Sequence, residues 1–206
     1  TKALHYSTVT DDSGAVTEAN YVSLGVPADL QFGTSQNFSI SYWVRFSGLP
    51  GDLPFFCNAI NSYSNDGYTF APSYPRGGWS WSFGGLGIYG PDATINNNQW
   101  HHLVHTADRT GSVTTYLDGV RVDYRPAGSQ NLDTGDPTNI GQDPTGSYPE
   151  AGGADIDDLA VWRRVLTPEE ALCIYSVGKN LGQSFDTTAV NMTVSFDGTQ
   201  ITVGWP

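Results

Sequence analysis

The segment from Asp143 to Glu150 carries the residues best suited to chemistry, because it is rich in oxygen donors. It begins Asp143-Pro144-Thr145-Gly146 and continues past Glu150 through Ala151-Gly152-Gly153. Calcium takes about six to eight oxygen ligands, from carboxylates and carbonyls, on loops that can bend around the ion. The loop supplies both kinds of oxygen, and the net charge of −12 favours cation uptake. We therefore expect calcium here; the alternative is a solvated acidic loop.

Aromatic side chains next to flexible turns could bind a sugar. Aromatic rings can lie flat against the C–H faces of a pyranose, while nearby amides and carboxylates bind its hydroxyl groups. The candidates are Trp43, Tyr74, Trp79, Trp81 and Tyr89. Each of them is also a good core residue, because burial is the usual fate of aromatic side chains. Segments 61–65 and 77–81 mix aromatic and polar residues, so we favour Trp79, Tyr63 and Tyr148 as residues lining a site.

Three histidines on one segment resemble a metal or acid–base cluster. They are His101, His102 and His105, in a run that is typical of a β-strand. Side chains alternate along a strand, so His101 and His105 share a face and His102 points away. Zinc would need a further convergent ligand, and the sequence suggests none. A structural role is therefore the favoured interpretation.

The common catalytic motifs are missing from the sequence. It contains no Gly-x-Ser-x-Gly, no phosphate-binding glycine loop and no His-Glu-x-x-His. The pair Glu169-Glu170 belongs to a predicted helix cap, and Glu18 and Glu150 lie in predicted loops. An enzyme is disfavoured, with a lyase that uses Tyr and His as the remaining alternative.

Alternation of polar and apolar residues predicts that the candidates sit on β-strands. Residues 38–46 alternate over nine positions, with Trp43 on the face opposite the apolar side chains. Further strands are predicted at 79–83, 100–105, 112–117, 120–122 and 156–162. In 79–83 the aromatic residues fall on one side and the serines on the other. Asp118-Gly119 between two strand patterns predicts a tight hairpin.

One helix and a second hairpin are predicted near the C-terminus. Thr167-Pro168-Glu169-Glu170 is a capping box, and Gly178 is a candidate C-cap, so a short helix should cover one end of the sandwich. Asp197-Gly198 lies between two further strand patterns, which predicts a hairpin. We expect one domain over 1–181, and an appendage or the start of a following module over 182–206.

Composition narrows the class of protein. The 206 residues include 9 Lys+Arg against 21 Asp+Glu, which disfavours nucleic-acid binding because phosphates need clustered cations. No apolar run approaches the ~20 residues that a bilayer crossing requires. Charged residues make up 15%, below the roughly 25% typical of soluble domains, while Gly, Pro and small polar residues are abundant. This mixture suits short strands joined by turns, so we predict an all-β fold.

Composition also bears on where the protein acts. The chain begins at Thr1-Lys2, without an initiator Met or an apolar signal core, which indicates a mature or excised fragment of a longer protein. Few charges and abundant Thr, Asn and Gly suggest a secreted or cell-surface location. There Cys57 and Cys173 could form a disulfide, although two buried thiols are slightly favoured.

The order of motifs resembles the laminin-G-like jelly rolls of the concanavalin A-like lectin/glucanase group. The matching segments are Tyr21-Val22-Ser23-Leu24, 38–44, Trp100-His101-His102-Leu103-Val104, Tyr116-Leu117-Asp118-Gly119, Asn139-Ile140-Gly141-Gln142, 156–162 and 166–170. They run in the group's order from roughly Ala3 to Gly178. The resemblance implies two antiparallel sheets packed face to face, one of them concave and often carrying a ligand. It does not imply one function, because the fold hosts lectins, hydrolases, lyases and adhesion modules.

A closer likeness is to the pentraxins, which are calcium-dependent members of this architecture. They follow an Ile-x-Gly-Gln strand end with an acidic loop and use an Asp-Asn pair on an earlier loop. The resemblance implies Asn65, Asp66, Asp143 and Glu150 as calcium ligands, with the Gln142 amide as a weaker one.

Related glucanases imply a second, structural calcium at Asp157, on the convex side. The turn Asp11-Asp12-Ser13-Gly14 could contribute to that site, although an ordinary Asx turn is favoured. Retaining glucanases of this fold also carry Glu-x-Asp-x-x-Glu on one strand, because alternate residues share a face. That string is absent here.

These observations favour one function. We predict a non-catalytic, calcium-assisted carbohydrate-binding or adhesion module of a larger secreted protein. Its partners would be a glycan or polysaccharide and other domains of the parent protein. The alternatives are a structural or protein-binding jelly roll without glycan affinity, and a polysaccharide lyase or hydrolase.

Overall fold

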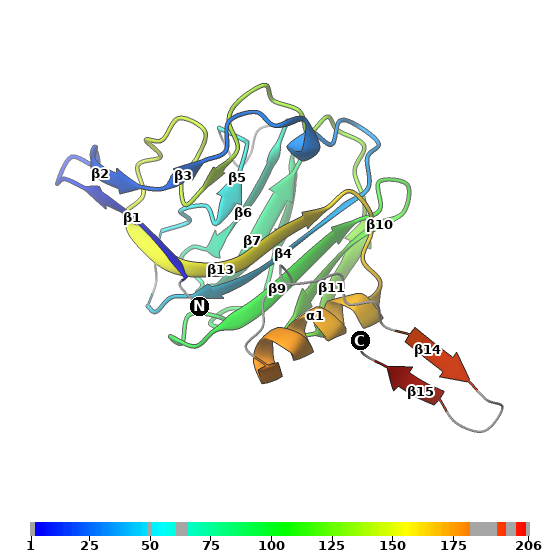
Figure 1. Cartoon of the computed structure of the whole chain (residues 1–206). Helices are drawn as coiled ribbons and strands as arrows, with labels where there is room; N and C mark the ends of the chain where they lie inside the picture. Colours follow the sequence, from blue (N-terminus) through cyan, green and yellow to red (C-terminus); the bar gives the residue numbers. More distant parts are fainter. Residues whose placement is uncertain (1–2, 49–50, 61–65, 182–192, 197–200, 205–206) are drawn as a thin grey trace.

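The computed structural model describes residues 3–48, 51–60, 66–181, 193–196 and 201–204. Most of them form two β-sheets packed face to face, with one α-helix on the outside (Figure 1). All strand pairs within both sheets are antiparallel. The predicted all-β, two-sheet antiparallel sandwich is therefore confirmed.

The two sheets differ in strand length. The seven-stranded sheet has the spatial order β11 (Val120–Pro126), β10 (Ser112–Leu117), β9 (His101–Ala107), β4 (Phe38–Arg45), β13 (Gly152–Trp162), β1 (Leu4–Thr10) and β2 (Val16–Asn20). The six-stranded sheet has the order β3 (Val22–Ser23), β12 (Asn139–Ile140), β5 (Phe56–Cys57), β6 (Tyr68–Ser73), β7 (Gly78–Phe83) and β8 (Leu86–Tyr89). A 3-10 turn, η1 (Ala28–Leu30), precedes β4.

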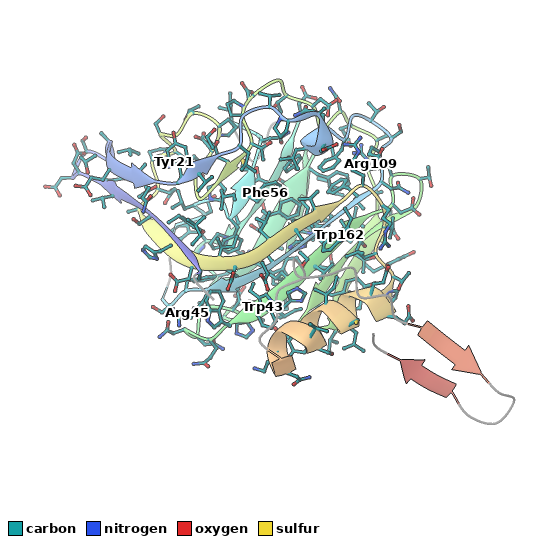
Figure 2. All side chains as sticks on the ribbon, in the orientation of Figure 1. Tyr21, Trp43, Arg45, Phe56, Arg109 and Trp162 are labelled. Atoms are coloured by element: carbon teal, nitrogen blue, oxygen red, sulfur yellow. The ribbon has the colours of Figure 1, made fainter. Side chains whose placement is uncertain are left out.

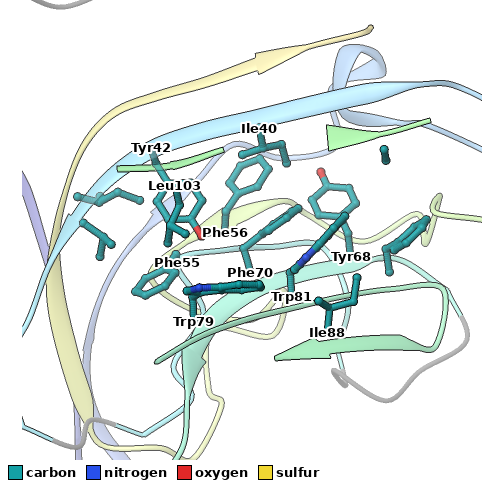
Figure 3. Close-up of a cluster of buried hydrophobic side chains, with 14 of the residues drawn as sticks. Ile40, Tyr42, Phe55, Phe56, Tyr68, Phe70, Trp79, Trp81, Ile88 and Leu103 are labelled. Carbon is teal, nitrogen blue, oxygen red and sulfur yellow. The ribbon is translucent and has the colours of Figure 1, made fainter. Parts of the chain in front are cut away.

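Large apolar side chains fill the space between the sheets. One face of β4 contributes Phe38, Ile40 and Tyr42, and the facing strands β6 and β7 contribute rings of their own. Phe70 and Trp81, which are neighbours on β6 and β7, stack at a centroid distance of 5.4 Å, and Figure 3 shows them in one cluster with Ile40 and Tyr42 of β4. Burial of this apolar surface is the main force that holds the sandwich together.

Two of the three clustered histidines are buried on opposite faces of β9. His105 lies in the core, where its Nε2 is 3.0 Å from the Tyr42 hydroxyl and its Nδ1 is 3.2 Å from Thr115 Oγ1. His102 faces the other way and lies 3.0 Å from Ser41 Oγ. Burial lowers the pKa of His105 to about 3 and that of His102 to about 4. Both rings are packing groups, in agreement with the structural interpretation.

Helix α1 (Pro168–Leu181) lies on the outer face of the seven-stranded sheet. Its capping box is confirmed: the Glu170 N–H donates to Thr167 Oγ1 at 3.2 Å, and the Thr167 N–H donates to Glu170 Oε2 at 2.8 Å. The helix buries Ala171 and Ile174 against the sheet. It thus covers one face of the sandwich, whereas the sequence predicted that it would cover one end.

The helix continues through Gly178, where a C-cap was predicted. A Cβ at Gly178 would lie 2.8 Å from Nε1 of Trp43, closer than atoms pack. Glycine therefore serves at this position to bring the helix against the Trp43 indole, which also stacks on Tyr175 at 5.7 Å. Figure 2 shows Trp43 on the side of the sheet that faces α1. This burial removes Trp43 from the candidate sugar-binding residues.

The remaining predictions on the chain concern its thiols and its C-terminal segment. Both cysteines are free, Cys57 buried and Cys173 exposed.

Strands β14 (Thr193–Phe196) and β15 (Ile201–Gly204) pair with each other as the second hairpin requires, while its Asp197-Gly198 turn lies outside the described residues. Within the described part of the chain, no helix combines the length and apolarity of a membrane span. The division at residue 181 stays a prediction.

The buried histidines predict acid sensitivity. In the unfolded chain a histidine has a pKa of about 6.5, so below this pH the unfolded state binds protons that His102 and His105 do not bind in the fold. Stability is therefore fully present above about pH 6.5 and is lost as the pH falls towards the folded-state values. Each histidine contributes a slope of up to about 1.4 kcal/mol per pH unit. Urea unfolding between pH 7.5 and 5.0 measures this slope.

The variants His102→Gln and His105→Gln provide the comparison. Each should lower stability at pH 7.5, because a packed ring is lost, and each should also reduce the slope. The double variant should come close to a flat profile in this range. A slope unchanged in both single variants would show that other groups cause the acid sensitivity.

Candidate functional site

A cavity of about 200 Å³ opens on the outer face of the six-stranded sheet. Its floor comes from β6, β7 and β8, in register: Thr69 pairs with Ser82 and Ser82 with Gly87. Side chains alternate along a strand, so the large rings between these positions point into the core and small polar groups point outward. The face is hollow because its side chains are small. It is the face of the sandwich opposite α1.

Aromatic and polar side chains form the walls of the cavity. Tyr74 and Tyr89 are 56% and 45% exposed. The Tyr89 ring lies across Gly87, where a Cβ would be 3.2 Å from ring atom Cε2. Tyr148 lies on the opposite wall, and its hydroxyl donates to Asp52 Oδ1 at 2.9 Å. Tyrosines and a carboxylate therefore surround a floor of small side chains.

The loop that carries Tyr148 is fixed by the buried Gln142 side chain. Its Oε1 accepts from the Asp143 N–H at 2.7 Å and from the Tyr148 N–H at 3.0 Å, so both ends of the loop bind one amide. Its Nε2 donates to Thr8 Oγ1 at 3.2 Å. Gln142 is thus a positioning residue, and its amide oxygen is already engaged by the backbone.

One hydroxyl in the floor has no partner. Ser73 lines the cavity, is 2% exposed, and its Oγ makes no hydrogen bond in the structure. By contrast, the neighbouring Ser80 hydroxyl lies 3.3 Å from the carbonyl oxygens of Ala71 and Pro72. A buried hydroxyl without a partner is unfavourable, so Ser73 is a position where a ligand hydroxyl or a water molecule would be stabilised.

Acidic residues gather at one end of the cavity. Asp52 and Asp143 line it, and Glu150 packs against the backbone of Gly51. Burial, together with the charge of Asp52, raises the pKa of the Glu150 carboxyl. The Cys57 thiol in the floor is inert, because burial raises its pKa to about 12.

The three residues predicted to line a sugar site have different positions in the structure. Tyr148 lines the cavity as predicted, and Tyr63 lies outside the described residues. Trp79 is corrected: its ring is fully buried in the core, at 0% exposure. The alternation in β7 was identified correctly, but the serines, not the indoles, face outward. Trp81 is also buried, with Nε1 donating to Thr115 Oγ1 at 3.1 Å.

The predicted calcium ligands do not form one cluster. Asp143 lines the cavity and Glu150 lies beside it, whereas Asp66 is exposed and is not among the lining residues, and Asn65 is outside the described part. The Asp143 Oδ1 accepts two hydrogen bonds from Thr145, at 3.0 and 2.6 Å. Among the residues that the structure describes, no three His, Cys, Asp or Glu side chains converge on a metal position.

The register keeps the Asp11 turn away from the second calcium position, so calcium at Asp157 stays a prediction without that turn. Leu4 pairs with Ile156, so Asp157 lies near the start of β1, while Asp11 follows its end. Eight residues of strand separate the two, or roughly 26 Å at 3.3 Å per residue. Asp11 instead accepts bonds from Ser13 N–H at 2.9 Å and Ala15 N–H at 3.0 Å, which is the favoured Asx turn.

The sequence interpretation missed several cavity residues. Asp52, Thr69, Ser73, Ser80 and Ser82 were not proposed as ligand-binding residues. The serines of β7 carried a usable signal, since small polar residues at alternate positions mark the solvent face of a strand. Asp52 carried none, because its contact with Tyr148 joins residues 96 positions apart.

A laminin-G-type family model, described as the concanavalin A-like lectin/glucanases superfamily, matches residues 16–171. The match covers more than half of the chain, so the protein belongs to this superfamily. The resemblance drawn from the motifs is confirmed. No curated protein matches the sequence.

Solved structures share this fold at low identity. The binding domain of Paraclostridial Mosquitocidal Protein 1 is similar with a TM-score of 0.60 and 20% identity, over 85% of this chain and 46% of that chain. A botulinum neurotoxin type C structure, described with two ganglioside molecules, gives 0.58 and 12%, over 85% and 46%. The botulinum neurotoxin DC binding domain in complex with SialylT gives 0.51 and 15%, over 68% and 35%. The chain spans less than half of each of these structures.

Proposed function

We propose that the protein is a non-catalytic carbohydrate-binding module of a larger secreted or cell-surface protein. It holds a glycan in the cavity of the six-stranded sheet. The observation that carries this proposal is the cavity itself, in which exposed tyrosine rings surround a floor of small polar side chains. Ser73 adds a buried hydroxyl without a partner.

The chemistry of the cavity matches that of a sugar. A pyranose has C–H faces that can lie against Tyr74 or Tyr89, and hydroxyl groups that can bond to Ser73 and Asp52. The cavity is smaller than the roughly 300–1,000 Å³ typical of pockets for drug-sized ligands. One sugar unit would enter it, and the adjoining units would lie over the tyrosines.

The comparisons give coarse support to this proposal. The superfamily is named for lectins as well as glucanases. Two of the similar structures are described as binding domains, one of them in complex with SialylT, and the description of the third names an interaction with two ganglioside molecules. Because this chain spans less than half of those structures, their ligands do not identify its own.

A polysaccharide hydrolase is the second candidate, and Glu150 is the observation that favours it. A carboxyl group with a raised pKa, beside the carboxylate Asp52, is an arrangement that general acid catalysis uses. Release of reducing ends from a polymer, and its loss in Glu150→Gln, would replace the binding proposal with this one.

The rim tyrosines provide a first test. Tyr74→Ala and Tyr89→Ala should each weaken binding about 3- to 10-fold, because an aromatic contact contributes about 0.5–1.5 kcal/mol. The measurement is titration calorimetry against mannohexaose, xylohexaose, cellohexaose and lactose. The control is Tyr124→Ala, because Tyr124 is 62% exposed on β11 of the other sheet. If none of these sugars binds, or if all three variants lose affinity equally, glycan binding in the cavity is excluded.

Ser73→Ala should have opposite effects on stability and on binding. Removing a buried hydroxyl without a partner should leave the free energy of unfolding unchanged or raise it by up to about 1 kcal/mol. Binding of the same sugar should weaken roughly 5- to 10-fold, since a hydrogen bond to the ligand is lost. Ser176→Ala, on α1, is the matched control. Loss of stability with unchanged affinity would show that Ser73 is a packing residue.

Calcium is a separate proposal. The acidic end of the cavity, with Asp52, Asp143 and Glu150, and the carbonyl oxygens of the 143–150 loop support it. The described residues do not complete such a site by themselves. The prediction is a thermal transition that rises with millimolar CaCl₂ over EDTA, as binding to the native state requires. MgCl₂ is the control. Identical transition temperatures in CaCl₂, MgCl₂ and EDTA would refute the calcium proposal.

A further inference from the structure

The charged groups at the cavity all have one sign. Among its lining residues the ionisable side chains are Asp52, Asp143, Cys57 and tyrosines, and there is no Lys, Arg or His. The Cys57 thiol and the tyrosine hydroxyls are neutral at pH 7, so the two aspartates determine the charge of the cavity. Glu150 adds a third carboxyl group next to Asp52.

These carboxylates lie partly out of water, which strengthens their effect on a ligand. Asp143 is 4% exposed, and Asp52 is half-buried under Tyr148. Charges interact more strongly where solvent is excluded than at an open surface. Burial is also the main cause of the raised pKa of Glu150, and the charge of Asp52 raises it further.

No described cation is placed to offset the aspartates within the cavity. Arg76 lies in the turn between β6 and β7, two residues after the lining residue Tyr74, and pairs with Asp92 at 3.9 Å, while Arg45 pairs with Asp155 at 2.6 Å. Carboxylate and sulfate ligands are held by Arg, Lys or free backbone N–H groups. In the middle of the floor, β7 pairs with β6 along its length and with β8 from Ser80 to Phe83, so its N–H groups are engaged in the sheet, whereas β8 forms the edge of the sheet.

The hydrogen-bonding groups in turn suit a neutral sugar. Among the residues that the structure describes, the Tyr148 hydroxyl donates one bond to the Asp52 carboxylate, and a carboxylate has capacity for about four. Sugar hydroxyls are donors that could use the remaining capacity, and the Ser73 hydroxyl can either donate or accept.

We infer that the cavity in its calcium-free state binds neutral glycans and rejects glycans whose bound sugar carries a carboxylate or a sulfate. This inference rests on the proposed function and names the class of ligand. It separates this protein from the ganglioside and SialylT ligands of the similar structures, because sialic acid carries a carboxylate.

The test compares neutral sugars with counterparts that carry carboxylate groups. Mannohexaose is paired with the mannuronate hexamer, and lactose with sialyllactose, in titration calorimetry at 50 mM NaCl with EDTA, so that no calcium offsets the carboxylates of the cavity. Wild type should bind the neutral member of at least one pair and bind its anionic partner at least about tenfold more weakly, a difference of about 1.4 kcal/mol. The ratio of the two affinities is the readout.

Asp52→Asn tests the cause of the discrimination. The amide keeps the size of the side chain and an oxygen that can accept from Tyr148, but it removes the charge. The affinity ratio should fall by about threefold or more. Glu150→Gln is a second variant with the same expected direction, in case Asp52→Asn folds poorly. Glu169→Gln makes the same change of net charge on α1, across the sandwich from the cavity, and should keep the wild-type ratio.

The outcomes separate the two proposals. Equal or stronger wild-type binding of the anionic member would overturn the inference and leave glycan binding intact. A ratio that falls equally in Glu169→Gln would show that net charge, not the cavity, causes the discrimination, and would also overturn it. Failure of every neutral and anionic sugar to bind would refute the proposed function and, with it, this inference.

Discussion

The alternation of side chains across the pleat of β6 and β7 is the constraint on which the rest of the structure depends. Each strand must present one face to the sandwich core and the other to solvent. In β7 the core face carries Trp79 and Trp81, fully buried, while Ser80 and Ser82 face outward. The same residue pattern therefore makes a dense interior and a shallow exterior. A one-residue shift in register would exchange the two faces and remove both the core and the cavity.

One outer face of the sandwich is covered and the other is exposed, because the side chains that point outward from the two sheets differ in size. On the seven-stranded sheet the outward residues include Trp43, which is large, apolar and only 7% exposed because α1 covers it. Gly178 allows the helix to approach that ring closely. On the six-stranded sheet the outward residues of β6 and β7 are small, and the larger rings of Tyr74 and Tyr89 beside them stay exposed. Burial of one face and accessibility of the other both follow from side-chain size.

The fold could be predicted from the sequence because strand and helix patterns lie in neighbouring residues. The site was harder to predict because its contacts join residues far apart in the sequence. Alternation over 38–46 and the capping box at Thr167 were read from neighbouring residues and are confirmed. The prediction for Trp79 was wrong because a ring beside a turn was favoured over the default of burial. The Tyr148–Asp52 hydrogen bond joins loops 96 residues apart, and no local pattern encodes it. Helix α1 extended past Gly178 because of a tertiary contact with Trp43, which overrode local capping preference.

The acidic side chains have different structural roles in different parts of the chain. Asp11 serves as the acceptor of an Asx turn, and Glu170 caps α1, so these charges are used by the backbone. Asp143 combines both roles, since it closes a turn through Thr145 while lining the cavity. Asp52 differs, because its hydrogen bond is to the Tyr148 side chain and the cavity-lining residues include no Lys, Arg or His. The net charge therefore does not describe the cavity, where the effect of a carboxylate depends on how far it is buried and on whether a cation lies beside it.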